Sequence, residues 1–436
     1  MATEVAVITA ATGAQFFYST YAAARTAATA YDKIQIWADL TNEQLLLKDK
    51  VDIWIAPGRI IQMTDSSPII LDNDGGYTSA VEVNISGNGF FKNTNEKYGC
   101  VKIINKDSKV SITCDNLENE GSDPTSLDGT TVYIESCSKF YLNCDKIVNS
   151  KQRAIYFEDE VPYVNIRANI IESGDYSGGD AVSFRGIGFL TANEIICKND
   201  ASCLFFRGGS LTANVLKLTT QSSGNASAGT VRMSGDSGGQ DLTLYFDEIQ
   251  NLNINGGDAV SANYGNINLI GRRIFSTDGL SLDLASDANI LVDEIISVTK
   301  GINIHNTSTQ KIIIDSNKIE GSNGNDGVIR SSTGSNYVIR NAKIINTYTG
   351  SSAPFSRGIF ISDNNQANDQ TIEIENLIIV TGTGSNDASI YRDGNQNIDI
   401  KNLTLFVKKD ISSNITLKIG TGITGNFKYI VSMDVS

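Results

Sequence analysis

One short pattern recurs along nearly the whole chain of 436 residues and limits what the chain can fold into. Each copy has an apolar residue, a small or polar residue two positions later, and a second apolar residue three positions after that. The copies close at Ile60, Phe90, Leu117, Ile147, Ile171, Ile195, Leu216, Ile249, Ile274, Ile295, Ile319, Ile344, Ile379 and Leu405. They number about fourteen and lie on average roughly 26 residues apart, a spacing typical of proteins built from stacked repeats.

A second pattern precedes most copies: a small residue, then an apolar, a variable and another apolar residue, as in residues 154–157 and 181–184. This alternation is typical of β-strands with one buried face, and Gly, Asn and Ser mark the turns between them. Leucine-rich repeats would show a Leu-x-x-Leu-x-Leu signature, and propeller blades need four strands in about forty residues. Neither fits, so the sequence predicts an all-β parallel β-helix of about fourteen coils, one coil per repeat.

The first fifty residues predict a cap for this solenoid. Phe17, Tyr21, Ala24, Ala28 and Tyr31 fall on one face at helical spacing. A short helix there would cover the apolar core and the strand edges that the first coil would otherwise expose. We therefore expect an N-terminal cap over residues 1–50 and a parallel β-helix over 51–436, in one domain, because no compositional break divides the chain.

Residues 21–61 resemble the beginning of pectin-lyase-like right-handed β-helices. These proteins commonly start with an Ala-rich capping helix, continue with short alternating strands and place a glycine before the next apolar pair. The resemblance implies a right-handed helix. The superfamily includes polysaccharide lyases, polygalacturonase-like hydrolases, bacteriophage tailspikes and non-enzymatic virion fibres, and the tailspike-type helices imply a homotrimer.

Motifs of the enzyme branches are missing from the sequence. Polygalacturonase-like hydrolases share Asn-Thr-Asp, Asp-Asp, Gly-His-Gly and Arg-Ile-Lys motifs, and pectate lyases share Trp-Ile-Asp-His and Arg-x-x-Arg arrangements; none is present. The only histidine, His305, has no flanking glycine and follows an apolar pair, which predicts an exposed side chain. These observations argue against catalysis.

Charge and composition exclude several partners. The chain has 35 basic and 49 acidic residues, a formal charge of −14, and lacks the clustered Lys and Arg of a duplex-binding protein. Its first residues have neither the basic region nor the apolar core of a signal peptide, and no apolar run approaches the ~18 residues of a membrane span. The six cysteines show no metal-ligand spacing, so we expect reduced thiols in the core of a protein assembled in a cytoplasm.

Aligning the second strand group of successive repeats predicts two outward rows of side chains. One row contains Glu158, Arg185, Arg207, Ser234, Asn263, Asp283 and His305; the other contains Tyr156, Ser183, Phe205, Arg232, Ser261, Ser281 and Asn303. Guanidinium groups beside aromatic rings suit an acidic or neutral glycan. The candidate carbohydrate-binding residues are Tyr156, Arg185, Phe205, Arg207 and Arg232, with Glu158 and Asp159 beside them. The alternative is an ordinary solvated face with a Glu–Arg pair between neighbouring coils.

Catalysis would need two carboxyl groups roughly 5–9.5 Å apart, and Glu158 with Asp180 is the candidate pair. Asp180 and Asp258 each stand just before the small residue of a strand, where a carboxylate that caps a turn is the simpler interpretation. Asp72 and Asp74 are the candidates for a calcium site, although the sequence predicts no metal and no cofactor.

Taken together, these features predict a structural or adsorption component of a bacteriophage-like particle, such as a tail spike, a tail fibre or a capsid-surface appendage. Such a protein would be located in the virion, contact other virion proteins and bind a surface polysaccharide of the host. Two alternatives stay open: a polysaccharide-degrading lyase or hydrolase of the same superfamily, and a bacterial surface adhesin.

Overall fold

The computed structural model describes residues 5–65, 67–72, 79–95, 97–121, 127–175, 179–221, 229–234, 239–305, 311–322, 327–331, 336–348, 357–361, 371–381, 388–392 and 397–407. The regular secondary structure of these residues is almost entirely β-strand, which confirms the predicted all-β class. The chain divides into two compact units, Met1–Leu216 and Lys217–Ser436.

The first unit begins with strands of mixed direction and continues with parallel ones. Strand β1 (Val5–Ile8) pairs antiparallel with β2 (Gln15–Tyr18) and with β3 (Lys33–Ile36), and α1 (Tyr21–Ala27) lies between β2 and β3 in sequence. The strands that follow are β4 (Leu40–Thr41), β5 (Leu45–Leu46), β6 (Asp52–Ile55), β7 (Ile60–Met63), β8 (Ile70–Leu71), β9 (Glu82–Gly87), β10 (Phe90–Asn93), β11 (Val101–Ile103), β12 (Lys109–Asn119), β13 (Val132–Ile134), β14 (Lys139–Asn149), β15 (Ile155–Phe157), β16 (Val161–Ser173), β17 (Val182–Cys197) and β18 (Leu204–Thr220), with a short 3-10 helix, η1 (Leu127–Gly129), before β13.

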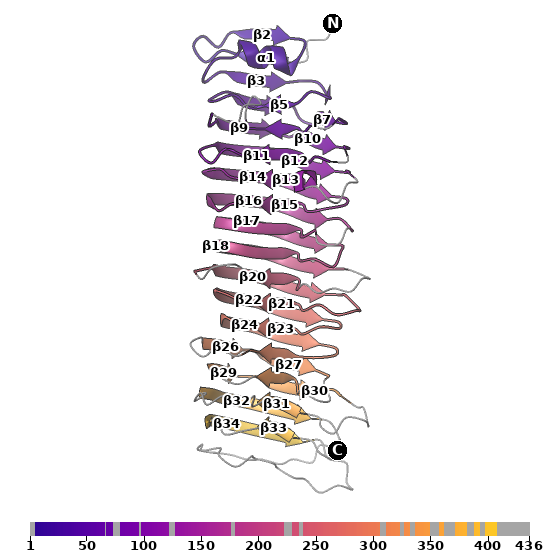
Figure 1. Cartoon of the computed structure of the whole chain (residues 1–436), viewed down its shortest axis with the longest axis vertical. Coiled ribbons are helices and arrows are strands. Elements are labelled where there is room, and N and C mark those ends of the chain that lie inside the picture. The colour runs from indigo at the N-terminus through magenta and orange to yellow at the C-terminus, as the bar shows by residue number, and fades with distance from the viewer. Residues whose placement is uncertain are drawn as a thin grey trace. The chain divides into compact units, whose positions relative to one another are not determined.

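Strands one repeat apart pair in parallel. Within the first unit β3, β6, β9 and β12 form one ladder, β12, β14, β16 and β17 continue it, and β11, β13, β15 and β17 form another. Figure 1 shows these strands one above the next within the unit. Parallel pairing at the repeat spacing is the hydrogen-bond pattern of a solenoid, as the sequence predicts.

The second unit repeats this arrangement. Its strands are β19 (Val231–Met233), β20 (Asp241–Asn251), β21 (Val260–Ala262), β22 (Asn266–Ser276), β23 (Leu282–Leu284), β24 (Asp287–Ser297), β25 (Ile302–Ile304), β26 (Lys311–Asp315), β27 (Lys318–Gly321), β28 (Ile329–Ser331), β29 (Asn336–Arg340), β30 (Lys343–Asn346), β31 (Arg357–Ile361), β32 (Thr371–Thr381), β33 (Ala388–Arg392) and β34 (Asn397–Val407). Short strands pair with short ones, as in β19, β21, β23 and β25, and long strands pair with long ones, as in β20, β22 and β24.

The repeat places its closing apolar residues in register inside each unit. Leu117, Ile147, Ile171 and Ile195 are Cα partners on successive strands of the first unit and are buried. Ile249, Ile274, Ile295, Ile319, Ile344 and Ile379 do the same in the second unit. The predicted core ladder is thus confirmed over most of its length.

Three of the predicted closing residues are wrong. Ile60 and Phe90 are partners of each other but lie opposite Asn116, so that Ile61 and Phe91 are the buried residues of those copies. Leu216 is 53% exposed. A slip of one residue along a strand turns a side chain to the opposite face, and two adjacent isoleucines or phenylalanines leave the inward one undecided in the sequence.

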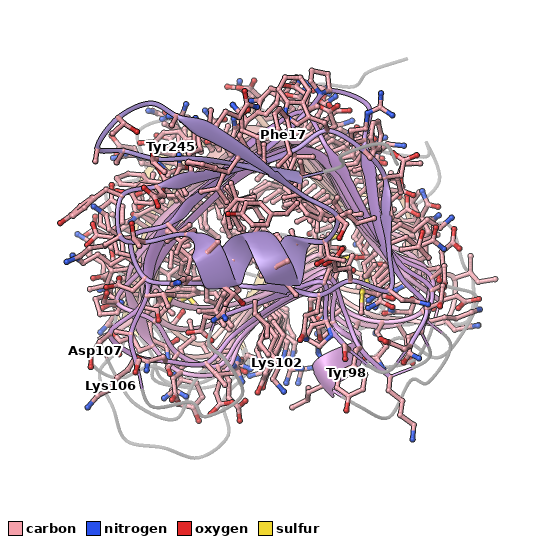
Figure 2. All side chains as sticks on the ribbon, turned by 90° about the horizontal axis from the view of Figure 1, so that it is seen from above. Phe17, Tyr98, Lys102, Lys106, Asp107 and Tyr245 are labelled. Atoms are coloured by element: carbon pink, nitrogen blue, oxygen red, sulfur yellow. The ribbon has the colours of Figure 1, made fainter. Side chains whose placement is uncertain are left out.

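The N-terminal helix is shorter than the sequence pattern predicts. Its buried residues are Tyr21 and Ala24, while Phe17 lies on β2 and is 54% exposed. Thr20 caps the N-terminus by accepting a hydrogen bond from the Ala23 N–H (3.2 Å). Viewed from above, α1 lies inside the outline of the strands, and the labelled Phe17 lies at the periphery (Figure 2). The helix therefore contributes a narrow apolar face to the first unit.

Large side chains fill the interior of the first unit. The rings of Phe140, Phe157, Phe184 and Phe206 follow one another from coil to coil, with centroids 6.1, 5.2 and 6.2 Å apart. All four are fully buried. The six cysteines are buried and free, as predicted.

Candidate functional site

Two stacked tyrosines form the centre of the candidate site on the outer face of the first unit. Tyr133 on β13 and Tyr156 on β15 are direct partners, and their rings are nearly parallel (8°), with centroids 6.0 Å apart. Lys102 on β11 is the next partner in the ladder, and its Nζ lies 5.5 Å from the Tyr133 centroid. In Figure 2 Lys102 lies on the outer side of the strands. We name Lys102, Tyr133, Arg153, Tyr156, Glu158, Arg185 and Arg207 the tyrosine–arginine cluster.

Arginines surround the Tyr156 ring. The guanidinium carbon of Arg207 lies 4.6 Å from the ring centroid and that of Arg153 lies 5.3 Å from it. Arg207 also donates to the Tyr156 hydroxyl (3.1 Å) and to the main-chain oxygens of Phe157 and Glu158. Arg207 lies on β18, two coils after Tyr156 on β15, and its side chain reaches back to the tyrosine ring. The guanidinium groups of Arg153 and Arg207 therefore both lie near this ring. Such cation–ring contacts are worth about 0.5–2 kcal/mol each.

Arg185 extends outward at the edge of this cluster. It is exposed and donates to the main-chain oxygen of Glu158 (3.2 Å). No carboxylate of the described residues lies within ion-pair distance of its guanidinium group. The Glu158 carboxylate instead accepts a hydrogen bond from the Tyr133 hydroxyl. The Glu–Arg ion pair of the alternative interpretation is therefore not formed, and Arg185 can bind an external anion.

The candidate catalytic carboxyl groups are not brought together. Glu158 follows the C-terminal end of β15, whereas Asp180 precedes β17, and the register of Ile155 with Val182 puts them at opposite ends of the ladder. Asp180 is 7% exposed and accepts the Ser202 N–H (3.0 Å), which is the predicted turn cap. Asp258 accepts the Leu280 N–H in the same way (2.9 Å).

The two other candidate carbohydrate-binding residues belong to different units. Phe205 is half-buried on β18 in the first unit. Arg232 belongs to the second unit, on β19, where its Cα partner is Ser261. Tyr133, Arg153 and Lys102 were not among the predicted site residues, although the alternation of apolar residues on β11 and β13 marks Lys102 and Tyr133 as outward.

One predicted row shifts by two residues in the second unit. Asp283, and not Ser281, is the partner of both Ser261 and Asn303. Ser281 is 1% exposed and takes the position of the small inward residue, because Leu282 and Leu284 are the buried pair of β23. Residue 280 is also apolar, so the sequence allows this strand to begin two residues earlier than it does. The predicted alignment of the row was wrong for this reason.

This shift creates a polar cluster around the only histidine. The Asp283 carboxylate accepts hydrogen bonds from Asn303 Nδ2 (2.9 Å) and His305 Nε2 (2.7 Å), and His305 is 46% exposed, as predicted. The hydrogen bond to Asp283 raises the pKa of His305 above its usual value. Burial, followed by the negative charge of Asp283, raises the pKa of Asp258 to about 6.

Asp72, a candidate calcium ligand, has a different role. It is fully buried and accepts hydrogen bonds from the Ile104 and Asn105 N–H groups and from the Ser108 hydroxyl (2.9, 3.1 and 2.9 Å). Burial raises the pKa of its carboxyl group to about 6. Asp74 lies outside the described residues. Asp72 therefore organises a turn.

Among the residues that the structure describes, no three His, Cys, Asp or Glu side chains are grouped to hold a metal ion. No helix in the described ranges has the length and apolar character that crossing a membrane requires.

Comparisons with known proteins add no relative to this description. No protein-family model, no curated protein and no solved structure matches the chain.

Proposed function

We propose that this protein binds an acidic surface polysaccharide through the tyrosine–arginine cluster of its first unit. The observation that carries the proposal is the exposed guanidinium group of Arg185, which donates to the main-chain oxygen two residues after Tyr156 of the stacked pair. A planar guanidinium group matches a carboxylate with two parallel hydrogen bonds. Tyr133 is only 6% exposed and Tyr156 is half-buried with Arg153 and Arg207 near its ring, so the tyrosines position the basic groups and the guanidinium group of Arg185 makes the contact with the glycan.

The charge of the cluster favours an anionic ligand. Four basic side chains, Lys102, Arg153, Arg185 and Arg207, surround the tyrosines, while the Glu158 carboxylate is engaged by the Tyr133 hydroxyl. Within the cluster four basic groups stand against the single carboxylate of Glu158, and the exposed carboxylates of Asp159 and Glu160 adjoin it in the turn after β15. Such a patch attracts a polyanion to one place on the surface.

We place this binding activity in an adsorption or structural component of a bacteriophage-like particle. The support is the resemblance of residues 21–61 to pectin-lyase-like proteins, together with the parallel repeat. In this proposal the fold is a right-handed β-helix of about fourteen coils, capped at its start by α1, and it forms a homotrimer attached to other virion proteins. Its ligand is then a host capsule or cell-wall glycan.

The test is retention on immobilised acidic polysaccharide. The Arg185→Ala, Arg207→Ala double variant is expected to lose at least about tenfold in affinity, because hydrogen bonds to charged groups are worth about 1.5–3 kcal/mol each. Arg272→Ala is the matched control, since Arg272 is an exposed arginine in the second unit and pairs with Asp247. Equal retention of both variants, or retention of neither them nor the parent protein, would contradict the proposal.

A further inference from the structure

A second pair of tyrosines follows the first one around the same two coils. Tyr141 lies near the start of β14 and Tyr163 near the start of β16, each in the strand that comes directly after a strand of the first pair. Their ring centroids are 5.3 Å apart, with the planes at 50°. The Nζ of Lys139 lies 5.0 Å from both centroids. Tyr163 is 38% exposed.

A β-bulge turns Tyr163 outward. Between β16 and β17 the partner of Val161 is Gly186 and the partner of Val164 is Gly188, so that Pro162 and Tyr163 face the single residue Ile187. Bulges commonly redirect a side chain at functional sites. The glycines let the backbones approach closely here, since a Cβ on Gly188 would lie 2.0 Å from the Val164 oxygen.

Strand β17 connects the two tyrosine pairs without a turn. Arg185, Ile187 and Phe189 alternate on its outward side and are all exposed, Ile187 by 48% and Phe189 by 51%. Phe189 is the partner of Asn165, which in turn is the partner of Tyr141. Alternate residues of a strand are about 7 Å apart. An apolar path therefore leads from Arg185 in the tyrosine–arginine cluster to Phe189 beside the second pair.

We propose that Tyr141, Tyr163, Ile187 and Phe189 form a second subsite that takes the uncharged sugar rings of the polysaccharide bound at the tyrosine–arginine cluster. This inference rests on the proposed function and extends it to the class of ligand. The subsite offers exposed rings and one lysine already held over both tyrosines, so it supplies apolar contact where the first cluster supplies charge. The ligand is then a polysaccharide in which acidic and neutral sugars alternate.

The choice of a neutral ring at the second subsite follows from the local charges. The turn between β15 and β16 carries Asp159 and Glu160, both exposed. Lys139 is the basic group of the subsite and lies over both tyrosine rings, so two carboxylates stand against one cation and disfavour a chain that carries a negative charge on every sugar. An aromatic ring holds a sugar through apolar contact, which salt does not screen, whereas exposed ion pairs weaken as the Debye length falls from about 8 Å at 0.15 M to about 3 Å at 1 M salt.

The experiment compares three probes on the full chain: hyaluronan, whose acidic and neutral sugars alternate, alginate, which is acidic throughout, and dextran, which is neutral. We expect the parent protein to bind hyaluronan best. Tyr163→Ala with Phe189→Ala should lower hyaluronan affinity roughly tenfold, and this loss should persist at 1 M salt. The loss caused by Arg185→Ala, in contrast, should shrink with salt.

Tyr245→Ala with Leu291→Ala is the control variant, since these residues are 43% and 51% exposed in the second unit. It should keep the parent affinity, and equal melting temperatures should show that both double variants are folded. Unchanged hyaluronan affinity in the Tyr163, Phe189 variant, or equal binding of alginate and hyaluronan by the parent protein, would overturn the second subsite while the proposed function stands. Retention of the parent on none of the probes would overturn both.

Discussion

Buried asparagines are the residues on which the turns of the solenoid depend most directly. Each of these asparagines stands at the end of a strand, and its amide Nδ2 donates to a main-chain oxygen between four and eleven residues further along the chain: Asn93, Asn119, Asn149, Asn251 and Asn346. Asn119 Nδ2 donates to the Gly129 oxygen (2.6 Å), and Asn119 Oδ1 accepts a hydrogen bond from the Gly121 N–H (3.0 Å). One side chain thus satisfies two buried backbone groups, which water cannot reach.

Replacing Asn119 by alanine is expected to lower the free energy of unfolding by about 1–3 kcal/mol, because the Gly121 N–H loses its partner inside the protein, whereas the Gly129 oxygen keeps the hydrogen bond from Asn149 Nδ2 (2.8 Å). Chemical denaturation of the two proteins measures this difference. Asn193→Ala is the control, since Asn193 is exposed and should change the value by less than about 0.5 kcal/mol. Similar values for the two variants would show that the buried amide does not support the turn.

The only histidine reports on its own neighbourhood. Its pKa is raised mainly by the hydrogen bond to Asp283, while Arg330 lowers it and Asp258 raises it further. We expect an NMR titration of His305 to give a value above about 6.5, and Asp283→Asn to lower it. Because the folded-state pKa is raised, the stabilisation from this pair is complete below the unfolded pKa and is lost as the pH rises through the folded one. An identical titration in both proteins would refute the pairing.

At the scale of elements, glycines determine where neighbouring strands approach most closely. A Cβ on Gly188 would lie 2.0 Å from the Val164 oxygen, whereas a Cβ on Gly208 of β18 would meet only the Arg185 side chain, at 3.7 Å. The first contact is a clash with backbone, which must move, and the second is ordinary van der Waals contact.

Gly188→Ala should therefore lower the free energy of unfolding by about 2 kcal/mol, within the range for overpacking. Gly208→Ala is the matched variant in the next strand and should leave stability nearly unchanged or raise it slightly. Thermal melting of both proteins tests the pair. A melting temperature of the Gly208 variant as low as that of the Gly188 variant would mean that close approach is not the cause.

At the scale of the whole molecule, each coil contacts mainly the coils next to it, so that stability is a sum of local terms. Phe184 illustrates this, since its ring packs between those of Phe157 and Phe206 in the first unit. Phe184→Ala should cost about 3–5 kcal/mol by leaving a cavity. Hydrogen exchange should show the loss of protection first in β15, β17 and β18. Equal loss in β3 and β6 would contradict a sum of local terms.

The sequence by itself determined the fold class and most of the core. The spacing of its apolar residues fixes which side chains point inward, and this alone predicts the ladder from Ile249 to Ile379 and the buried thiols. It also predicts the turn-capping role of Asp180. These properties follow from period-two alternation within one strand, which needs no knowledge of the neighbouring coil.

Only the tertiary structure decided which outward side chains meet. Tyr133 and Tyr156 stack because the turns between them place β13 and β15 in register, and Asp283 meets Asn303 and His305 because β23 starts two residues later than the pattern suggests. The bulge that exposes Tyr163 contains Pro162 and lies opposite Gly186 and Gly188, residue types that occur at bulges, but the two-against-one register follows only from the pairing of β16 with β17. Outward contacts depend on turn lengths, which vary from coil to coil, because no packing constraint holds outward side chains as the core holds inward ones.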